Sequence, residues 1–104
     1  MDKEINLSIN QYLSLIKRNH KGIGKVILFG SYAKNNAGKD SDIDIALIFD
    51  KLDDFDKFDL QVQLMLLAAQ VDSRIEPHPF SKKDFNSNNP FVCEIKRTGI
   101  EINS

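Results

Sequence analysis

Two carboxylates lie two residues apart in a stretch that is otherwise apolar. Asp42 and Asp44 alternate with Ile43 and Ile45, which is the pattern of a β-strand with one face towards a core. On such a strand both carboxylates point to the same side, where their like charges repel unless a cation lies between them. Mg²⁺ prefers oxygen ligands and is held by carboxylates together with substrate phosphates. The pattern therefore predicts a divalent metal site.

A phosphate-binding turn is predicted shortly before these carboxylates. The apolar run Val26–Phe29 reads as a buried strand and ends at Gly30-Ser31. Glycine lets the backbone approach a ligand closely, and serine can cap a following helix, whose N-terminal N–H groups bind anions. Alone, a Gly-Ser pair is usually a plain turn and an Asp-x-Asp pair a solvated strand edge. Together they outline a site for a nucleotide and a metal.

This combination resembles the signature of the DNA polymerase β-like nucleotidyltransferases, which is Gly-Ser, a short helix, then Asp-x-Asp on a strand. The resemblance is strong from Val26 to Ile48 and looser elsewhere. The short chain is most similar to the minimal nucleotidyltransferase (MNT) group, which is commonly encoded beside a HEPN-domain partner as a toxin–antitoxin pair. We therefore expect one domain over residues 1–104, of the α/β (α+β) class. Its polymerase β-like core would be a small mixed sheet of about four strands with helices mainly on one face.

The resemblance also implies roles for residues outside the paired aspartates. The family has a third carboxylate on a strand after the long helix. Glu76 is our first choice for it and Asp72 the second, although the family's residue is commonly aspartate. Lys34 stands where the family often has a basic residue that approaches the triphosphate, and it also fits an ordinary solvated lysine. Ser41 is expected to hold the nucleotide-binding loop or the neighbouring Asp42.

Two polar residues next to Glu76 have more than one interpretation. Arg74 could bind a phosphate, but we expect it to pair with Glu76. His78 lies between Pro77 and Pro79, and we interpret it as a strand-end histidine rather than a base or a metal ligand. Because proline has no N–H to donate, this strand should lie at a free edge of the sheet, or its pairing should end there.

Hydrophobic periodicity and capping residues predict the remaining elements. Helices are expected over residues 4–19, after Asp53 or Asp54, and from Asn89-Pro90 to Gly99, with short helical turns over 32–35 and after Ser81. Strands are expected over 25–29, 43–49, 71–80 and 100–102. The second long helix should bury the face formed by Phe58, Val62, Met65, Leu66 and Ala69. Leu64, Leu67 and Ala68 widen this face, so the helix should be more buried than the first.

Composition excludes several classes of protein. The formal net charge is −1, which argues against stable nucleic-acid binding through a broad basic surface. The single cysteine, Cys93, cannot form an intramolecular disulfide and is expected to be a helix residue. No targeting segment is visible, and the longest apolar run, 65–69, is too short to span a bilayer. We expect a cytoplasmic protein.

The chemistry predicted for the site is nucleotidyl transfer. Asp42, Asp44 and Glu76 would hold two Mg²⁺ ions, while Gly30 and Ser31 would hold the triphosphate. A nucleoside monophosphate would leave an NTP with release of pyrophosphate, and the resemblance implies ATP as the donor. Larger members of the superfamily carry an extra domain for the acceptor, so a partner chain is expected to supply it here. By resemblance this partner is a HEPN protein modified on a hydroxyl, which makes the chain an antitoxin; self-association is left open.

Three other functions fit parts of the pattern. An inactive nucleotidyltransferase-like subunit could neutralise its partner by binding alone, although it would not need the complete set of site residues. Nucleotidylation of a small molecule such as an antibiotic would call for a second domain. A metal-dependent nuclease could use similar carboxylates but would not need the Gly30-Ser31 turn.

Overall fold

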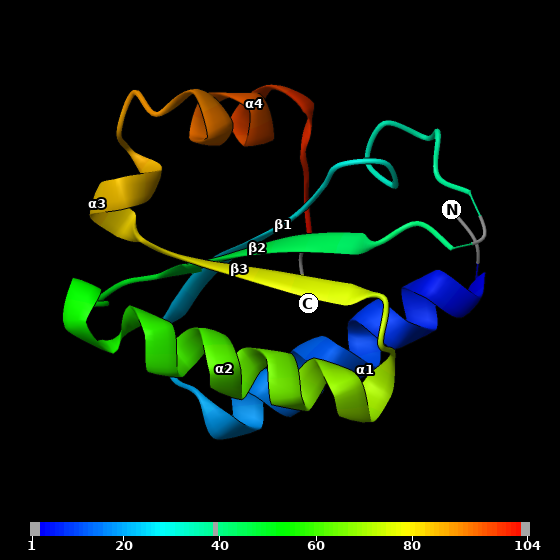
Figure 1. The fold of residues 1–104 in the computed structure, drawn as a ribbon, viewed down its shortest axis with the longest axis horizontal. Helices are drawn as coiled ribbons and strands as arrows, with labels where there is room; N and C mark the ends of the chain where they lie inside the picture. The colour runs from blue at the N-terminus through cyan, green and yellow to red at the C-terminus, as the bar shows by residue number, and fades with distance from the viewer. Residues whose placement is uncertain (1–2, 39, 103–104) are drawn as a thin grey trace.

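A computed structural model describes residues 3–38 and 40–102 of the chain. Four helices pack around one mixed sheet (Figure 1). In chain order the elements are α1 (Lys3–Asn19), β1 (Ile23–Phe29), β2 (Ile43–Phe49), α2 (Asp54–Val71), β3 (Ile75–Ser81), α3 (Lys82–Phe85), α4 (Pro90–Thr98) and β4 (Ile100–Glu101).

The sheet has the strand order β3-β2-β1-β4. β1 is antiparallel to β2 and to β4, whereas β3 runs parallel to β2. The expectation of a mixed sheet of four strands is therefore confirmed. β3 lies at an edge, as Pro77 and Pro79 predicted, because neither residue has an N–H with which to bind a further strand. The carbonyl of Pro77 instead accepts a hydrogen bond of 2.7 Å from the Gln61 side chain of α2.

Strand alternation divides the core into two layers. The side chains of Ile43, Ile45 and Leu47 face α1 and α2, whereas Ala46 and Ile48 face the side of α3 and α4. Figure 1 shows the two long helices on one face of the sheet and the two short helices on the other. The long helices thus cover one face as expected, and the second face carries a smaller core of its own.

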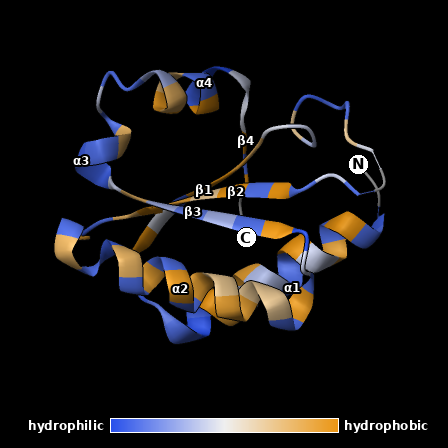
Figure 2. Ribbon diagram, in the orientation of Figure 1, coloured by the Kyte–Doolittle hydropathy of each residue, from blue (hydrophilic) through white to orange (hydrophobic). Residues whose placement is uncertain are grey.

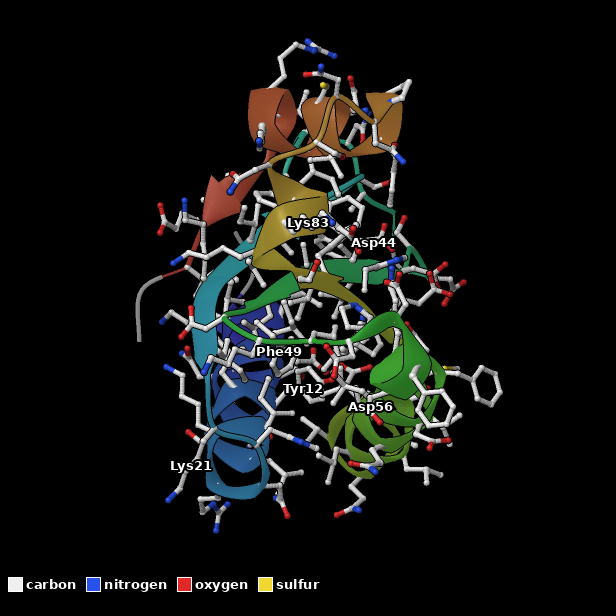
Figure 3. All side chains as sticks on the ribbon, turned by 90° about the vertical axis from the view of Figure 1, so that its left-hand side faces the viewer. Tyr12, Lys21, Asp44, Phe49, Asp56 and Lys83 are labelled. Carbon is white, nitrogen blue, oxygen red and sulfur yellow. The ribbon has the colours of Figure 1, made fainter. Side chains whose placement is uncertain are left out.

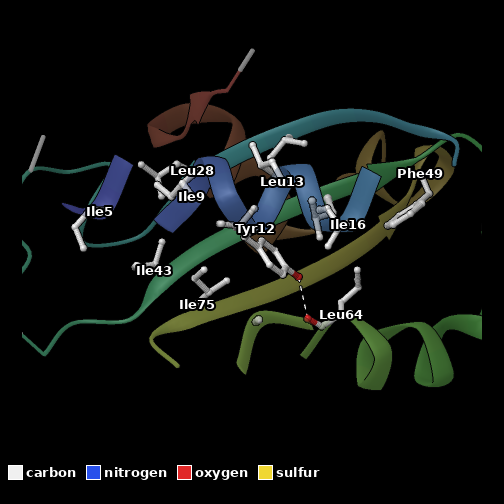
Figure 4. Close-up of a cluster of buried hydrophobic side chains, with 14 residues drawn as sticks. Ile5, Ile9, Tyr12, Leu13, Ile16, Leu28, Ile43, Phe49, Leu64 and Ile75 are labelled. Atoms are coloured by element: carbon white, nitrogen blue, oxygen red, sulfur yellow. Dashed lines mark hydrogen bonds between the residues drawn. The ribbon is translucent and has the colours of Figure 1, made fainter. Parts of the chain in front are cut away.

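α1 follows its predicted pattern closely. Its five predicted core residues are all buried: Ile5, Ile9, Tyr12, Leu13 and Ile16. The hydroxyl of Tyr12 donates a 3.0 Å hydrogen bond to the carbonyl of Leu64, which joins α1 to α2 (Figure 4). Burial raises the pKa of this hydroxyl well above its ordinary value. The bond satisfies the one polar group of an otherwise apolar contact.

α2 differs from the prediction in the face that it buries. The expected core residues Phe58, Val62, Met65 and Leu66 are all exposed, as is Ala69. Leu64 and Ala68, which were expected to widen that face, are buried as predicted, and Leu67 is partly buried together with Leu60 and Val71. α2 is therefore less buried than α1, and several of its large apolar residues are exposed. Figure 2 shows hydrophobic residues along much of its length.

The capping predictions at the two short helices are confirmed. The Ser81 hydroxyl accepts from the N–H of Asp84 at the start of α3, and the Asn89 side chain accepts from the N–H of Phe91 at the start of α4. Both bonds satisfy N–H groups that a helix start leaves without a partner. α4 ends at Gly99 as expected, and Cys93 is an exposed residue of this helix.

Two boundaries differ from expectation. The residues after Ser31 form hydrogen-bonded turns up to Asn35, which has a φ of 60°, and not an α-helix. The strand predicted from Val71 begins only at Ile75, because α2 continues through Val71 and Asp72 caps its C-terminus. Within the part of the chain that the structure describes, no helix combines the length and apolar character needed to cross a membrane.

Candidate active site

The parallel pairing of β2 with β3 places two acidic residues side by side. Asp44 lies opposite Glu76 on β3 and opposite Phe29 on β1. Since side chains alternate along each strand, Asp44 and Glu76 share the sheet face that α3 and α4 partly cover. Two of the three predicted carboxylates are thus brought together from strands separated in sequence by the whole of α2.

His78 joins these carboxylates, although we interpreted it from the sequence as a strand-end residue. One potential ligand atom each from Asp44, Glu76 and His78 lie within 4.8 Å of one another. The Nε2 atom of His78 is 3.2 Å from Oδ1 of Asp44. Two carboxylates and an imidazole form a donor set that suits a divalent cation. The signal in the sequence was the spacing, because residues 76 and 78 of one strand must share a face.

Aromatic rings fix the position of the His78 ring. Its centroid lies 5.0 Å from that of Phe29 and 6.0 Å from that of Phe91, both in edge-on arrangements. Phe29 and Phe91 also contact each other, with centroids 5.6 Å apart. β1, β3 and α4 therefore combine to hold the imidazole beside Asp44. Packing of this kind restricts the rotamers of a site residue and keeps its nitrogen in place.

The surroundings of Glu76 disfavour the ionised form of its carboxyl. Burial raises the pKa of the Glu76 carboxyl, and the negative charges of Asp42 and Asp44 raise it further. These effects outweigh the opposite influence of His78. A carboxylate whose ionised form is disfavoured by its neighbours is stabilised when a cation binds between them. The donor atoms and the charge at the site therefore both fit a divalent metal ion.

Asp42 occupies a different position from Asp44. It is exposed and lies just before β2 begins, so its carboxylate is not one of the three clustered groups. Its charge nevertheless acts on Glu76. Asp42 thus borders the site on its solvent side, where a ligand bound between protein and solvent would contact it.

Gly30 is required by the geometry of the turn after β1. Its φ is +73°, a left-handed conformation that other residues adopt only with strain. A Cβ atom at this position would also collide with the carboxylate of Asp44. The backbone of Gly30 therefore lies directly against a predicted metal ligand. This contact brings the predicted phosphate-binding turn to the carboxylates.

Backbone hydrogen bonds within the turn come from its later N–H groups. The N–H of Lys34 bonds to the carbonyl of Gly30 at 3.1 Å, and the N–H of Asn36 bonds to that of Ser31 at 3.1 Å. Because the first of these bonds spans four residues, the N–H groups of residues 31–33 have no acceptor within the turn. Although the predicted helix is absent, the start of the turn still presents donors of the kind that bind phosphate.

Lys34 and Ser41, both predicted near the nucleotide, have contacts of their own. The Nζ atom of Lys34 is 3.3 Å from Oε1 of Glu94, an exposed ion pair that connects the turn to α4. The hydroxyl of Ser41 accepts a 2.8 Å hydrogen bond from the N–H of Gly38 and so closes the loop before Asp42. This contact also fits a simple turn residue, and a role of Ser41 in nucleotide binding stays a prediction.

Asp72, the second choice for the third carboxylate, is engaged elsewhere. Its two oxygens accept from the Arg74 guanidinium at 3.0 and 2.7 Å, and one of them accepts from the Ser8 hydroxyl at 3.0 Å. The hydrogen bond from the Arg74 side chain is the main cause that lowers the pKa of Asp72 to about 2. The expected pairing of Arg74 with Glu76 is wrong, because Arg74 pairs with Asp72.

Sequence comparisons show the family to which the chain is related. Residues 10–104 match the family described as polymerase beta, nucleotidyltransferase. A protein of Methanocaldococcus jannaschii that is provisionally named as a protein adenylyltransferase is 34% identical over 82 residues. The match covers 76% of this chain and 80% of that protein.

Solved structures share the fold. A toxin–antitoxin crystal structure with AMP-PNP has a TM-score of 0.61 and 26% identity, covering 88% of this chain and 69% of that chain. A structure of the tri-AMPylated Shewanella oneidensis HEPN toxin in complex with an MNT antitoxin has a TM-score of 0.58 and 24% identity. The match covers 92% of this chain and 69% of that chain. A nucleotidyltransferase structure from Sulfolobus solfataricus, also provisionally named, has a TM-score of 0.64 at 15% identity, covering 97% and 86%.

Proposed function

The chain belongs to the polymerase β nucleotidyltransferase family, and on that premise we propose that it transfers AMP from ATP to a hydroxyl group of a partner protein. The main support for this proposal is that the turn at Gly30, strand β2 and strand β3 meet at the site. The Gly30 turn lies against Asp44, and Asp44 lies opposite Glu76. A place for phosphate and a place for metal therefore adjoin each other.

Asp42, Asp44 and Glu76 are the residues that we assign to Mg²⁺, with His78 beside them. When bound, Mg²⁺ would neutralise charge on the nucleotide phosphates and on the oxygens that attack and leave. The N–H groups after Gly30 and the Ser31 hydroxyl would orient the triphosphate, and the loop closed by Ser41 would place Asp42. Lys34 would approach the phosphates only after leaving Glu94.

The proposed reaction is an in-line displacement at the α-phosphorus. The acceptor oxygen forms a bond to this phosphorus, and the bond from phosphorus to the β-phosphate oxygen breaks. Pyrophosphate leaves with that electron pair, and the hydroxyl proton passes to water. In such reactions the protein acts chiefly by positioning the groups and stabilising the developing charge.

A HEPN-domain protein is the partner that we propose, with this chain as the antitoxin that modifies it. The toxin–antitoxin structure with AMP-PNP, at 26% identity, supports a toxin–antitoxin pair that binds an ATP analogue, and the HEPN assignment comes from the family resemblance. The M. jannaschii relative supports protein as the acceptor class and AMP as the transferred group. The second candidate, a subunit that neutralises its partner by contact alone, is favoured by a different observation, the exposed apolar side chains of α2.

The position of the label in ATP distinguishes these functions. The purified protein, Mg²⁺ and the HEPN-domain protein proposed as its partner are incubated with ATP labelled either at the α- or at the γ-phosphate. We expect α-label on the HEPN protein and no γ-label, with no α-label when Asp42→Asn/Asp44→Asn replaces the wild type. Asp50→Asn/Glu101→Gln, which removes the same charge away from the site, should still transfer. A complex that forms without any labelling would support the binding subunit instead.

A further inference from the structure

The outer surface of α2 exposes an apolar stripe that the fold leaves uncovered. Phe55 is 93% exposed and Phe58 75%, and the stripe continues along the helix. Figure 3 shows aromatic rings that project from α2 near Asp56 into the solvent. Contiguous exposed apolar surface of this kind marks a site for another macromolecule. The further members of the stripe are Val62, Met65 and Leu66, which are 39%, 54% and 62% exposed.

The spacing of the exposed apolar residues on α2 indicates which kind of secondary structure would pack against them. Phe55, Phe58, Val62, Met65 and Ala69 follow one another at intervals of three, four, three and four residues. This is the spacing of a coiled-coil contact, in which a second α-helix packs its side chains between those of the first. We call these five residues the α2 seam. Its geometry favours a helix as the occupant.

The charge beside the α2 seam identifies the chemistry of that helix. Asp54, Asp56 and Asp59 lie on α2 among the seam residues. A hollow of about 620 Å³ borders the same helix, and its charged lining residues are Asp53, Asp56 and Asp59 with one lysine, Lys51. The only basic residue of α2 is Lys57, which is 3.9 Å from Asp84 and lies over the ring of Phe80. A helix with lysine or arginine at its flanks would complement this surface.

We propose that the α2 seam binds an α-helix of the acceptor protein, with an apolar stripe flanked by basic residues. The inference rests on the proposed function, because it takes the acceptor to be a separate protein. A second copy of this chain is a poorer occupant. Two α2 helices would bring together many aspartates and only one lysine each, so most of their carboxylates would have no opposite charge.

The position of α2 is compatible with catalysis on a docked protein. α2 covers the sheet face opposite to that of Asp44 and Glu76, and it lies along the edge strand β3 (Figure 1). A helix bound to the α2 seam would therefore leave the nucleotide face open. The acceptor hydroxyl would reach the site around the β3 edge, which Pro77 and Pro79 keep free of a further strand.

The first test measures binding of the purified HEPN-domain protein that we propose as the partner. Phe58→Ser/Met65→Ser should weaken its affinity about 30-fold or more, as expected for aromatic and apolar anchors at the centre of an interface. Leu7→Ser/Ile100→Ser is the matched control, because these side chains are 58% and 49% exposed on other elements. The control should bind as the wild type does. Thermal denaturation and AMP-PNP binding should be the same for both variants and the wild type.

A second test examines the charge of the occupant. Asp59→Lys should weaken binding of the HEPN protein about 10-fold and reduce the dependence of its affinity on salt. Glu101→Lys makes the same change in charge on β4 and should have neither effect. An increase in affinity with Asp59→Lys would show that the occupant is not basic and would overturn the proposal.

The outcomes separate this inference from the proposed function. Wild-type affinity for the seam variant, or no binding of the HEPN protein to the wild type, would overturn the docking proposal. A dimer of this chain that dissociates in Phe58→Ser/Met65→Ser would overturn it in favour of self-association. If the seam variant loses binding while the wild type binds without transferring AMP, the docking proposal stands and the proposed function fails.

Discussion

Replacing Asp72 and Glu76 one at a time should show that one residue stabilises the fold and that the other takes part in AMP transfer. Both residues are acidic and close in sequence, and both were candidates for the third carboxylate. In the structure Asp72 is bound by Arg74 and Ser8, whereas Glu76 lies beside Asp44. We therefore predict that Asp72→Asn destabilises the protein and leaves transfer intact, and that Glu76→Gln abolishes transfer and leaves the fold intact.

The size of the Asp72 effect follows from its pKa. The fold lowers this pKa to about 2 from an ordinary value of 3.8, which corresponds to about 2.5 kcal/mol of stabilisation of the ionised form at pH 7. The side chain is only 12% exposed, so screening by solvent removes little of this. The asparagine side chain can still accept a hydrogen bond from the backbone N–H of Arg74. We therefore expect Asp72→Asn to lower the free energy of unfolding by about 1–2.5 kcal/mol. In a domain of this size the melting temperature would fall by roughly 10 °C.

The dependence on pH has opposite signs for the two residues. Since folding lowers the pKa of Asp72, its contribution is complete above the ordinary pKa of 3.8 and is lost as the pH falls towards about 2. The difference in melting temperature between wild type and Asp72→Asn should shrink over this range. Folding raises the pKa of Glu76, so its ionised form lowers stability at neutral pH. Glu76→Gln should melt at the wild-type temperature or above it.

Two assays test this prediction on the same preparations. Melting is followed by circular dichroism between pH 2 and pH 7, and transfer is followed with α-labelled ATP at a temperature where every variant is folded. Loss of transfer in a folded Asp72→Asn variant would show that the third carboxylate is Asp72. Retention of transfer in Glu76→Gln would refute the reasoning from the strand register.

Three further substitutions test other parts of the structure. Gly30→Ala should destabilise the protein by about 1–2 kcal/mol, because of the positive φ. It should also reduce the affinity for AMP-PNP, because the added Cβ displaces the Asp44 carboxylate. Calorimetry measures the stability and the nucleotide affinity. An unchanged affinity would contradict the proposed contact of the turn with the nucleotide. His78→Gln should weaken Mn²⁺ binding about 10-fold in an electron paramagnetic resonance titration, and wild-type affinity would show that the imidazole has no part in the metal site. Tyr12→Phe removes the hydrogen bond to the Leu64 carbonyl and should lower the free energy of unfolding, measured by chemical denaturation, by about 1 kcal/mol. An unchanged free energy of unfolding would show that this hydrogen bond does not contribute to stability.

Much of the fold follows from local signals in the sequence. The five core residues of α1 and the caps Ser81 and Asn89 were identified correctly, because each depends on periodicity or on one hydrogen bond to a nearby N–H. The two prolines of β3 likewise required an edge strand. For the site, the sequence singled out both Asp44 and Glu76, and the strand register places them opposite each other.

The errors concern features that depend on distant parts of the chain. α2 is apolar on more than one face, so periodicity alone could not determine which face packs on the sheet. The structure buries Leu64 and Ala68 and leaves Phe58 in solvent. His78 was interpreted as a strand-end histidine because only its neighbours in the sequence were considered. Its contact with Asp44 arises from the pairing of β2 with β3. Arg74 was assigned to Glu76 on the assumption that the strand began before Ile75, whereas it pairs with the helix cap Asp72.

The most direct measurement of the central claim is the intact mass of the HEPN protein after co-expression with this chain. Transfer of AMP predicts that its mass increases by one or more adenosine monophosphates, and that Asp42→Asn/Asp44→Asn eliminates the increase while the two proteins still purify together. A HEPN protein of unchanged mass in a stable complex with the wild-type chain would contradict nucleotidyl transfer to this partner.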